Sequence, residues 1–356
     1  MKSIRPIIFL GKRALVLALT VVVAVYVTIY VANMGGYVDE IVKGEALLRV
    51  SQEVRANPAN RALNETQVRN LIEQLYQNEL KRLGFDQPFI VRSFNYLRDA
   101  LSLELGRSLF ISSDSGSRSV RVIIMERLPN TVLLFTTTQL ILFFLGLFTG
   151  LFLSRRYGSR IDKIMTLLTP MSSLPGWFYG LFLILIFASV LRVLPYGGMV
   201  DVPPPTDRFE YALSVLRHMI LPILSWLTAY FFISTYTRRT FFLIFSSEDY
   251  VEVAKAKGLP EPLIRRRYIL RPTLPPIITD LSLTLLASWT GAIITETVFN
   301  WPGVGSLFYV ASVTFDTPVL VGLVVIYAYL LAITVFVLEL VYAILDPRVR
   351  TGVMAG

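Results

Sequence analysis

Residues 14–33 read ALVLALTVVVAVYVTIYVAN and contain no charged side chain. A helix of about 20 apolar residues crosses the roughly 30 Å hydrocarbon layer of a bilayer. Five further runs of this character lie near 128–153, 164–191, 217–240, 273–297 and 317–345. The sequence therefore predicts an all-α polytopic membrane protein with six transmembrane helices.

The composition agrees with this fold class. Hydrophobic residues make up 54% of the 356 residues and charged residues 17%, against roughly 45–50% and 25% in soluble domains. Four basic residues precede the first apolar run, as in a secretory signal peptide, but that run is too long for one and no small-residue cleavage pattern follows. We therefore expect residues 14–33 to be a retained helix.

The net charge of +9 follows the predicted topology. Segments 1–13, 154–163, 238–271 and 346–356 carry +4, +3, +4 and +1, whereas 192–216 and 298–316 carry −1 each. The positive-inside rule then places both chain ends in the cytoplasm and the long segment between the first two spans outside. The basic excess is thus explained by topology, and we expect no nucleic acid partner and a location in the inner (cytoplasmic) membrane.

Five regions follow from this pattern. Residues 1–34 hold the cytoplasmic N-terminus and first span, 35–127 an extracytoplasmic helical insert, and 128–345 a five-helix core with a cytoplasmic loop at 241–272; residues 346–356 form a cytoplasmic tail. In the insert, apolar residues at spacings of three and four predict a helix with Asn64 as N-cap and Gly84 as its stop. A second amphipathic stretch runs from Phe89 to Leu109, and a loop covers residues 112–119.

The loop at 241–272 is the longest predicted cytoplasmic connection. Ser247 can cap a helix that Gly258 ends, and a second short helix through Ile264 to Leu270 is expected to stop at Pro272. The pattern predicts two short helices separated by a glycine turn. Such a unit is too polar to lie in lipid.

This loop contains Glu252-Val253-Ala254-Lys255-Ala256-Lys257-Gly258. The stretch resembles the signature loop of the permeases of ATP-binding-cassette importers, which has a glutamate, two alanines, three variable residues and a glycine. Val253 departs from that pattern, but the position of the loop, between the fourth and fifth predicted spans, is the same. Over most of the chain the sequence resembles the dipeptide, oligopeptide and nickel branch of these permeases.

Further motifs carry the resemblance to this branch. They are Tyr96-Leu97-Arg98, Leu105-Gly106-Arg107-Ser108, Glu126-Arg127-Leu128-Pro129-Asn130-Thr131, Ser173-Leu174-Pro175, Leu216-Arg217-His218, Leu221-Pro222, Glu248-Asp249-Tyr250, Glu296-Thr297-Val298-Phe299-Asn300-Trp301-Pro302-Gly303 and Leu345-Asp346-Pro347-Arg348. The segment from about Gly36 to Phe94 matches least. The resemblance implies a type I importer permease core formed by the last five helices. It also implies a second homologous permease subunit, two ATPase subunits and an external solute-binding protein as partners.

The residues of the loop suit a rigid segment that leaves the membrane and binds a partner protein. Small residues, Ala254 and Ala256, leave room for a partner surface, and Gly258 permits a sharp turn. Charged residues can pair across an interface; these are Glu252, Lys255, Lys257, Arg265, Arg266 and Arg267. The alternative is a basic amphipathic helix that rests on anionic lipid.

Two other groups are candidate sites. Glu296, Asn300, Trp301 and Pro302 form either an aromatic belt at the membrane surface or an outer rim that contacts the donor protein. Thr284, Ala287, Ser288 and Gly291 share one face of the fifth span, which either packs against a neighbouring helix or lines the pore. Asp280, Glu296 and Glu339 are carboxylates inside predicted spans, and Asp280 can neutralise Arg271.

The chain is not expected to be an enzyme or to bind a cofactor. It has no cysteine and a single histidine, His218, so a His/Cys metal site is not expected, and Gly11-Lys12-Arg13 is not a Walker A motif. ATP and Mg²⁺ would bind the partner ATPases. Peptides are the favoured cargo by resemblance, oligosaccharides are the alternative, and nickel ranks below both. An ion-coupled carrier using Asp280 and Glu339 is the rival class, although no inverted repeat is visible.

Overall fold

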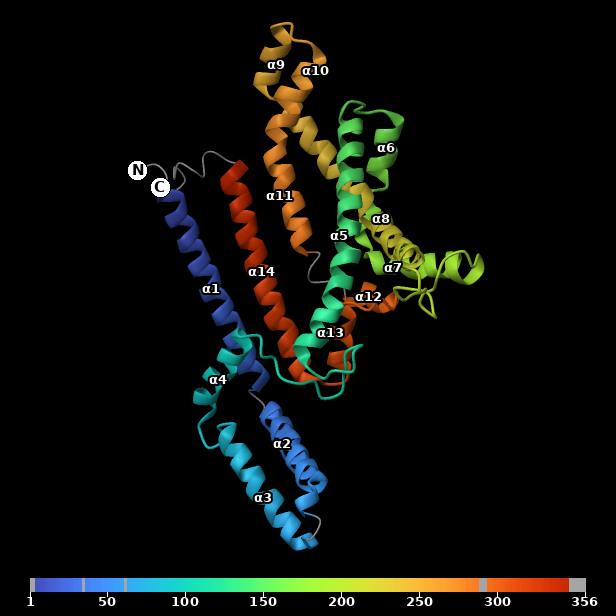
Figure 1. Ribbon diagram of the computed structural model, residues 1–356. Helices are drawn as coiled ribbons and strands as arrows, with labels where there is room; N and C mark the ends of the chain where they lie inside the picture. The colour runs from blue at the N-terminus through green and yellow to red at the C-terminus, as the bar shows by residue number, and fades with distance from the viewer. Residues whose placement is uncertain (1–3, 34–35, 61–62, 288–292, 346–356) are drawn as a thin grey trace. The chain divides into compact units, whose positions relative to one another are not determined.

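The computed structural model describes residues 4–33, 36–60, 63–287 and 293–345, and every regular element among them is a helix (Figure 1). The chain divides into two compact units. Unit 1 comprises residues 1–123 and 314–332, and unit 2 comprises residues 124–313 and 333–356.

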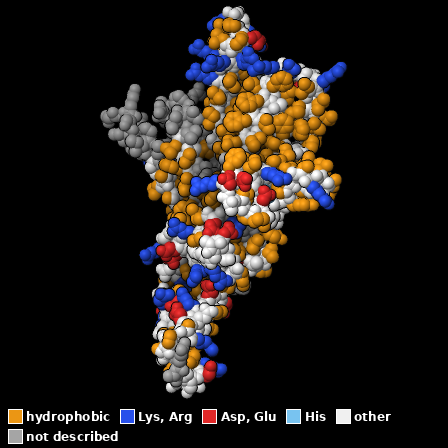
Figure 2. All heavy atoms as spheres, turned by 45° about the vertical axis from the view of Figure 1, so that its right-hand side comes forward, with side chains coloured by type: hydrophobic (Ala, Val, Ile, Leu, Met, Phe, Trp, Pro, Cys, Tyr) orange, Lys and Arg blue, Asp and Glu red, His pale blue; other side chains and the backbone are white. Residues whose placement is uncertain are grey.

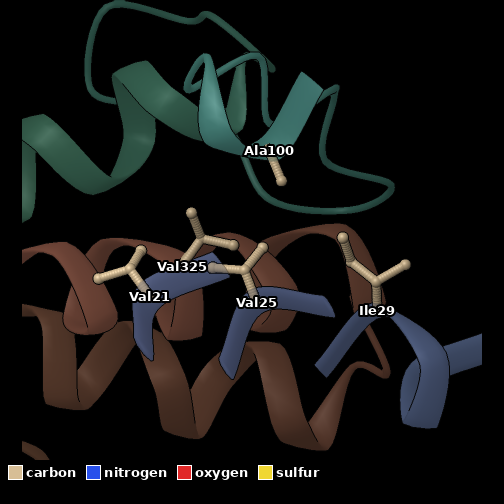
Figure 3. Close-up of a cluster of buried hydrophobic side chains, with 5 residues drawn as sticks. All are labelled: Val21, Val25, Ile29, Ala100 and Val325. Carbon is tan, nitrogen blue, oxygen red and sulfur yellow. The ribbon is translucent and has the colours of Figure 1, made fainter. Parts of the chain in front are cut away.

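Unit 1 contains α1 (Ile4–Asn33), α2 (Tyr37–Ala56), a 3-10 turn (Pro58–Asn60), α3 (Glu65–Arg82), α4 (Phe89–Leu101) and the first part of α14 (Thr317–Leu345). Apolar side chains of three helices meet in one cluster. Figure 3 shows Val21, Val25 and Ile29 of α1 with Ala100 of α4 and Val325 of α14. This packing anchors the end of the insert to two apolar helices.

The insert confirms part of the sequence prediction. Asn64 caps α3 through a reciprocal pair of bonds: its Oδ1 accepts from Gln67 N at 2.8 Å, and Gln67 Oε1 accepts from Asn64 N at 3.0 Å. Gly84, with φ 79°, follows the end of α3 as expected. The second stretch was predicted too long, since α4 ends at Leu101. The loop at 112–119 is confirmed, but α2 was not predicted.

Ionic contacts hold the insert helices together. Arg92 of α4 is buried and donates two hydrogen bonds to Asp39 of α2, at 3.0 and 2.6 Å, while its guanidinium lies 4.4 Å from the centre of the Phe85 ring.

The loop after α4 is held by Asp316, a residue just before α14. Asp316 Oδ2 accepts a hydrogen bond from Ser108 Oγ at 2.6 Å. The same oxygen also accepts from the backbone N–H groups of residues 109–111. Asp316 thereby joins the loop after α4 to the start of α14.

Unit 2 contains the elements of the predicted core. They are α5 (Val120–Ser154, most of which lies in this unit), α6 (Arg160–Leu167), a 3-10 turn (Thr169–Ser173), α7 (Gly176–Leu183), the π-helix η3 (Ile184–Val190), α8 (Arg208–Ser246), α9 (Asp249–Ala256), α10 (Glu261–Leu263), the π-helix η4 (Ile264–Leu270), α11 (Arg271–Ala287), α12 (Ile293–Val298), α13 (Val304–Val313) and the end of α14. Helices α7 and α8 pack against each other, and α6 lies against α8.

The helices long and apolar enough to cross a membrane are Gly11–Asn33, Val120–Ser154, Arg208–Ser246 and Thr317–Leu338 among the described residues. A fifth span is possible if Arg160–Ser173 and Gly176–Val190 count as one, but the two halves are bent by 96°. The helix predicted at 164–191 is therefore interrupted at Leu174, because Pro175 disfavours a helical residue before it, and its crossing of the membrane stays a prediction. The fifth predicted span, 273–297, covers α11, α12 and residues 288–292, which lie outside the described residues. The count of six stays a prediction.

Candidate functional site

The α8–α11 connection (residues 247–270) forms the expected helix, turn and helix. Helix α9 ends next to Gly258, whose φ of 69° favours glycine. Two details of the prediction were wrong. Glu248 rather than Ser247 is the N-cap of α9 and makes no side-chain capping bond. The second helix does not stop at Pro272, because η4 runs directly into α11, whose second residue is Pro272, a position that tolerates proline.

The inner face of this connection is apolar. Val251 and Ala254 of α9 are buried against Ile264 of η4, with Leu259 and Tyr268 packed beside them. The prediction that Ala254 faces a partner was therefore wrong, because residues 251 and 254 lie three apart on the helix and share the buried face. This contact makes α9 and η4 one packed body.

The outer face of the connection is charged. Glu252, Lys255, Lys257, Arg266 and Arg267 are exposed, and Arg265 is half-buried. Figure 2 shows Lys and Arg side chains gathered where α9 and α10 lie, with hydrophobic side chains covering the face of the neighbouring long helices. A hollow of about 510 Å³ lies alongside, lined by Leu263, Arg266, Arg267, Leu270, Arg271 and Leu274. The connection thus presents a cluster of basic side chains beside four exposed acidic ones, which are Glu248, Asp249, Glu252 and Glu261.

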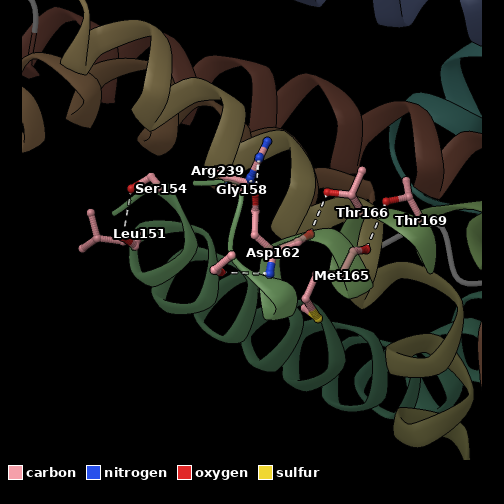
Figure 4. Close-up of polar contacts among 9 residues, drawn as sticks. Leu151, Ser154, Gly158, Asp162, Met165, Thr166, Thr169 and Arg239 are labelled. Atoms are coloured by element: carbon pink, nitrogen blue, oxygen red, sulfur yellow. Dashed lines mark hydrogen bonds and ion pairs between the residues drawn. The ribbon is translucent and has the colours of Figure 1, made fainter. Parts of the chain in front are cut away.

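A buried ion pair fixes the base of this connection (Figure 4). Arg239 of α8 donates hydrogen bonds from Nε and Nη2 to the two carboxylate oxygens of Asp162 on α6, the second at 2.6 Å. Asp162 Oδ2 also accepts from Gly158 N at 2.9 Å. The guanidinium lies 5.0 Å from the Tyr157 ring centre. The short loop between α5 and α6 is thereby held to α8 eight residues before the connection begins.

Close contact between α5 and α8 depends on two glycines. A Cβ on Gly150 would lie 2.9 Å from Arg239 N, and one on Gly146 would lie 2.4 Å from Ser234 Oγ. Small residues at this spacing let two membrane helices approach closely. The GxxxG pattern in an apolar run was visible in the sequence, and the prediction missed it.

Asp280 of α11 pairs with a different arginine from the one expected. Its Oδ2 accepts from Arg238 Nη2 of α8 at 2.6 Å. Asp280 therefore neutralises an arginine as expected, but its partner is not Arg271, which begins the same helix nine residues away. The pair joins the two long helices on either side of the α8–α11 connection.

Glu296 forms the centre of a buried network. Its side chain has no exposed surface and accepts hydrogen bonds from Thr131 Oγ1 and Ser306 N, both at 2.8 Å. A Cβ on Gly303 would lie 2.4 Å from Glu296 Oε2. Glycine at position 303 therefore leaves the space that the carboxylate occupies.

Trp301 lies in the same network and is also fully buried. Its Nε1 donates to Asn130 O at 3.0 Å, and Asn130 Nδ2 donates to Pro302 O at 2.8 Å. The Trp301 side chain is therefore enclosed by residues of the chain itself, which differs from the exposed position that both the belt and the rim interpretations gave it. Of the four rim candidates only Asn300 is exposed, since Pro302 is half-buried.

The small-residue face of the fifth span is described only in part. Thr284 is half-buried and lines a groove with Gln139 of α5 and Ser234 of α8. The side chain of Ala287, and Ser288 and Gly291, lie outside what the structure describes. Their role stays a prediction. Over the described ranges no group of three or more His, Cys, Asp or Glu residues could hold a metal ion.

Comparison with known proteins identifies the family. The sequence model of one protein family, described as the binding-protein-dependent transport system inner membrane component, matches residues 143–351. The chain belongs to this family. The matched range begins within α5 and contains the α8–α11 connection and Arg239.

Curated relatives align over about three quarters of the chain. The probable D,D-dipeptide transport system permease protein DdpB of Escherichia coli is 30% identical over 301 residues, which cover 79% of this chain and 86% of the relative. The oligopeptide transport system permease protein AppB of Bacillus subtilis is 28% identical over 272 residues, covering 76% and 84%. The di/tripeptide transport system permease protein DppB of Pseudomonas aeruginosa is 29% identical over 297 residues, covering 79% and 87%. The chain is therefore similar to permeases over most of their length.

Proposed function

We propose that this chain is one of two pore-forming permease subunits in an ATP-driven, binding-protein-dependent importer of dipeptides or oligopeptides. Three relatives whose names specify peptide transport support the cargo. The family description supports an external solute-binding protein as partner. The remaining partners are a second homologous permease and two ATPase subunits, which bind ATP and Mg²⁺.

The single observation that carries the mechanism is the continuity of η4 with α11. Helix α9 packs on η4 through Val251, Ala254 and Ile264, and η4 passes into α11 without a break. A force applied to the exposed side of α9 therefore reaches a helix of the core without crossing a flexible joint. Closure of the ATPases on ATP would move this connection and turn the pore outward, and hydrolysis would reset it.

The charge pattern supports the orientation. Segments 238–271 and 154–163 carry +4 and +3, so both belong on the cytoplasmic side with the chain ends. The Arg239–Asp162 pair joins α8, which leads into the connection, to α6, which follows the loop after α5. The exposed Glu252 is the acidic contact for a basic ATPase surface, and the exposed lysines and arginines pair with acidic residues there.

The test reverses one charge on the outer face of α9. In the reconstituted importer, Glu252→Lys is expected to abolish ATP-dependent uptake of a labelled tripeptide and to weaken ATPase binding. Glu73→Lys, the same change on the exposed surface of α3, is the matched control and leaves both unchanged. Normal coupled uptake by the Glu252 variant would refute the docking role, and uptake that follows a proton or sodium gradient without ATPase subunits would refute the importer class.

A further inference from the structure

A groove lined by charged, polar and apolar side chains runs between helices of unit 2. Its two adjoining hollows, of about 230 and 180 Å³, share Thr237, Arg238 and Asp280 in their linings. The larger hollow adds polar groups from three helices: Gln139 of α5, Tyr230 and Ser234 of α8, and Thr284 of α11. Helices that face only lipid or one another do not gather charged and amide groups in this way, because such groups are costly in hydrocarbon.

The geometry points to a binding site for the carboxylate end of a transported peptide, with Arg238 as the residue that contacts it. This inference rests on the proposed function. Arg238 is held in place from three sides. Its Nη1 donates to Ser234 O at 3.2 Å, its Nη2 to Asp280 Oδ2 at 2.6 Å, and its guanidinium lies 4.7 Å from the Phe143 ring centre.

The guanidinium has capacity left for a ligand. Its side chain is 12% exposed, and its Nε has no hydrogen-bond partner among the described residues. A guanidinium carries five N–H groups in a fork that suits a carboxylate. The arginine is therefore positioned and incompletely satisfied, as a binding residue requires.

Asp280 supplies the opposite charge. Its side chain is 55% exposed and only one of its oxygens accepts from Arg238. The groove therefore offers a cation and an anion side by side, with hydroxyl and amide groups nearby. A zwitterionic peptide carries a carboxylate, an ammonium group and backbone amides that match this set, whereas a neutral oligosaccharide has no charges to match it.

The space supports a hydrated path better than a helix-packing contact. A cavity holds one water molecule for roughly every 10–15 Å³ of space that the centre of a water-sized sphere can reach. Both hollows therefore hold several waters or a small polar segment. The groove adjoins the close contact of α5 and α8, since a Cβ on Gly146 would lie 3.2 Å from Arg238 Nη1.

The experiment compares one tripeptide with its C-terminal amide in the complete importer reconstituted with the same binding protein. Arg238→Gln is expected to lower uptake of the free-carboxylate peptide about tenfold, the size of a lost charged hydrogen bond, with a much smaller effect on the amide. The preference for the free carboxylate therefore falls. Arg208→Gln, the same change at the exposed start of α8, leaves the preference unchanged.

Other outcomes have defined meanings. An equal fall for both peptides assigns Arg238 a structural or gating role, and no fall excludes it from the path; either result overturns the inference. If the Arg238 variant does not assemble with its partners, Asp280→Asn replaces it. That variant is expected to reduce the preference for a free over an acetylated N-terminus, and an unchanged preference overturns the inference. Failure of the unmodified importer to take up either peptide with ATP would instead refute the proposed function.

Discussion

Replacing Asp162 with alanine tests whether the pair with Arg239 fixes the base of the α8–α11 connection. The two side chains are 2% and 8% exposed as residues, and Asp162 also accepts from Gly158 N. The substitution leaves a buried guanidinium and a backbone N–H without their acceptor. Breaking a buried pair from one side costs about 3–5 kcal/mol. The lower end of this energy range applies to Asp162, because the pair adjoins the exposed loop at residues 155–158.

The assay is the free energy of unfolding of the purified chain in mixed micelles, measured for a cycle of variants. Asp162→Ala is expected to cost about 3 kcal/mol, whereas the double variant Asp162→Leu with Arg239→Met costs less than Asp162→Ala alone, because it removes both charges together. The exposed pair of Glu40 and Lys43 is the control, and loss of Glu40 has little effect. Additive costs in the cycle, or a cost for Asp162→Ala no larger than the control, would refute the reasoning.

Three further predictions concern other parts of the chain. Gly150→Leu overpacks the α5–α8 contact and is expected to destabilise the chain by roughly 1–3 kcal/mol in the same assay, whereas Gly44→Leu, where no atom lies within 4 Å of an added Cβ, does not; equal effects would contradict the close contact. The hydrogen bond from Arg82, and the Arg49 charge with it, lower the pKa of Glu79 below its ordinary value of 4.5. Its stabilising effect is therefore present above pH 4.5 and lost as the pH falls below it, so Glu79→Gln is expected to flatten the loss of insert helicity on acidification, measured by circular dichroism. Trp301→Ala is expected to cost about 3–5 kcal/mol without changing the affinity of the donor protein, and a selective loss of donor binding would restore the rim interpretation.

The elements that the sequence predicted well have strong local signals. The helix from Asn64 to Gly84 has a capping box at one end and a left-handed glycine at the other, both set by neighbouring residues. Helix α2 was missed because its apolar residues are spread around the helix, among charges of both signs, instead of gathering on one face. Its buried positions, Ala46, Val50 and Val54, are nevertheless four residues apart, and this spacing was a usable signal.

The candidate site was predictable in its location and less so in its contacts. The position of the α8–α11 connection follows from charge and turn residues near Gly258. The partners of Arg238 and Arg239 depend on how α8 packs on α11 and α6. The periodicity of apolar residues along one helix carries no information on which helix lies beside it. Trp301 was placed at the surface for the same reason. An aromatic residue beside proline and glycine suits an interface, and only the fold shows that it is enclosed.

The π-helical turn at Ile264–Leu270 has a consequence for how this protein can change over evolutionary time. A π turn accommodates one residue more than an α turn within a continuous helix. Deleting a single codon there would return the segment to a regular α-helix and leave the direction of α9 relative to α11 nearly the same, whereas a deletion within α11 would rotate what precedes it by about 100°. We therefore expect the loss of one residue among descendants to be tolerated better at Ile264–Leu270 than within α11.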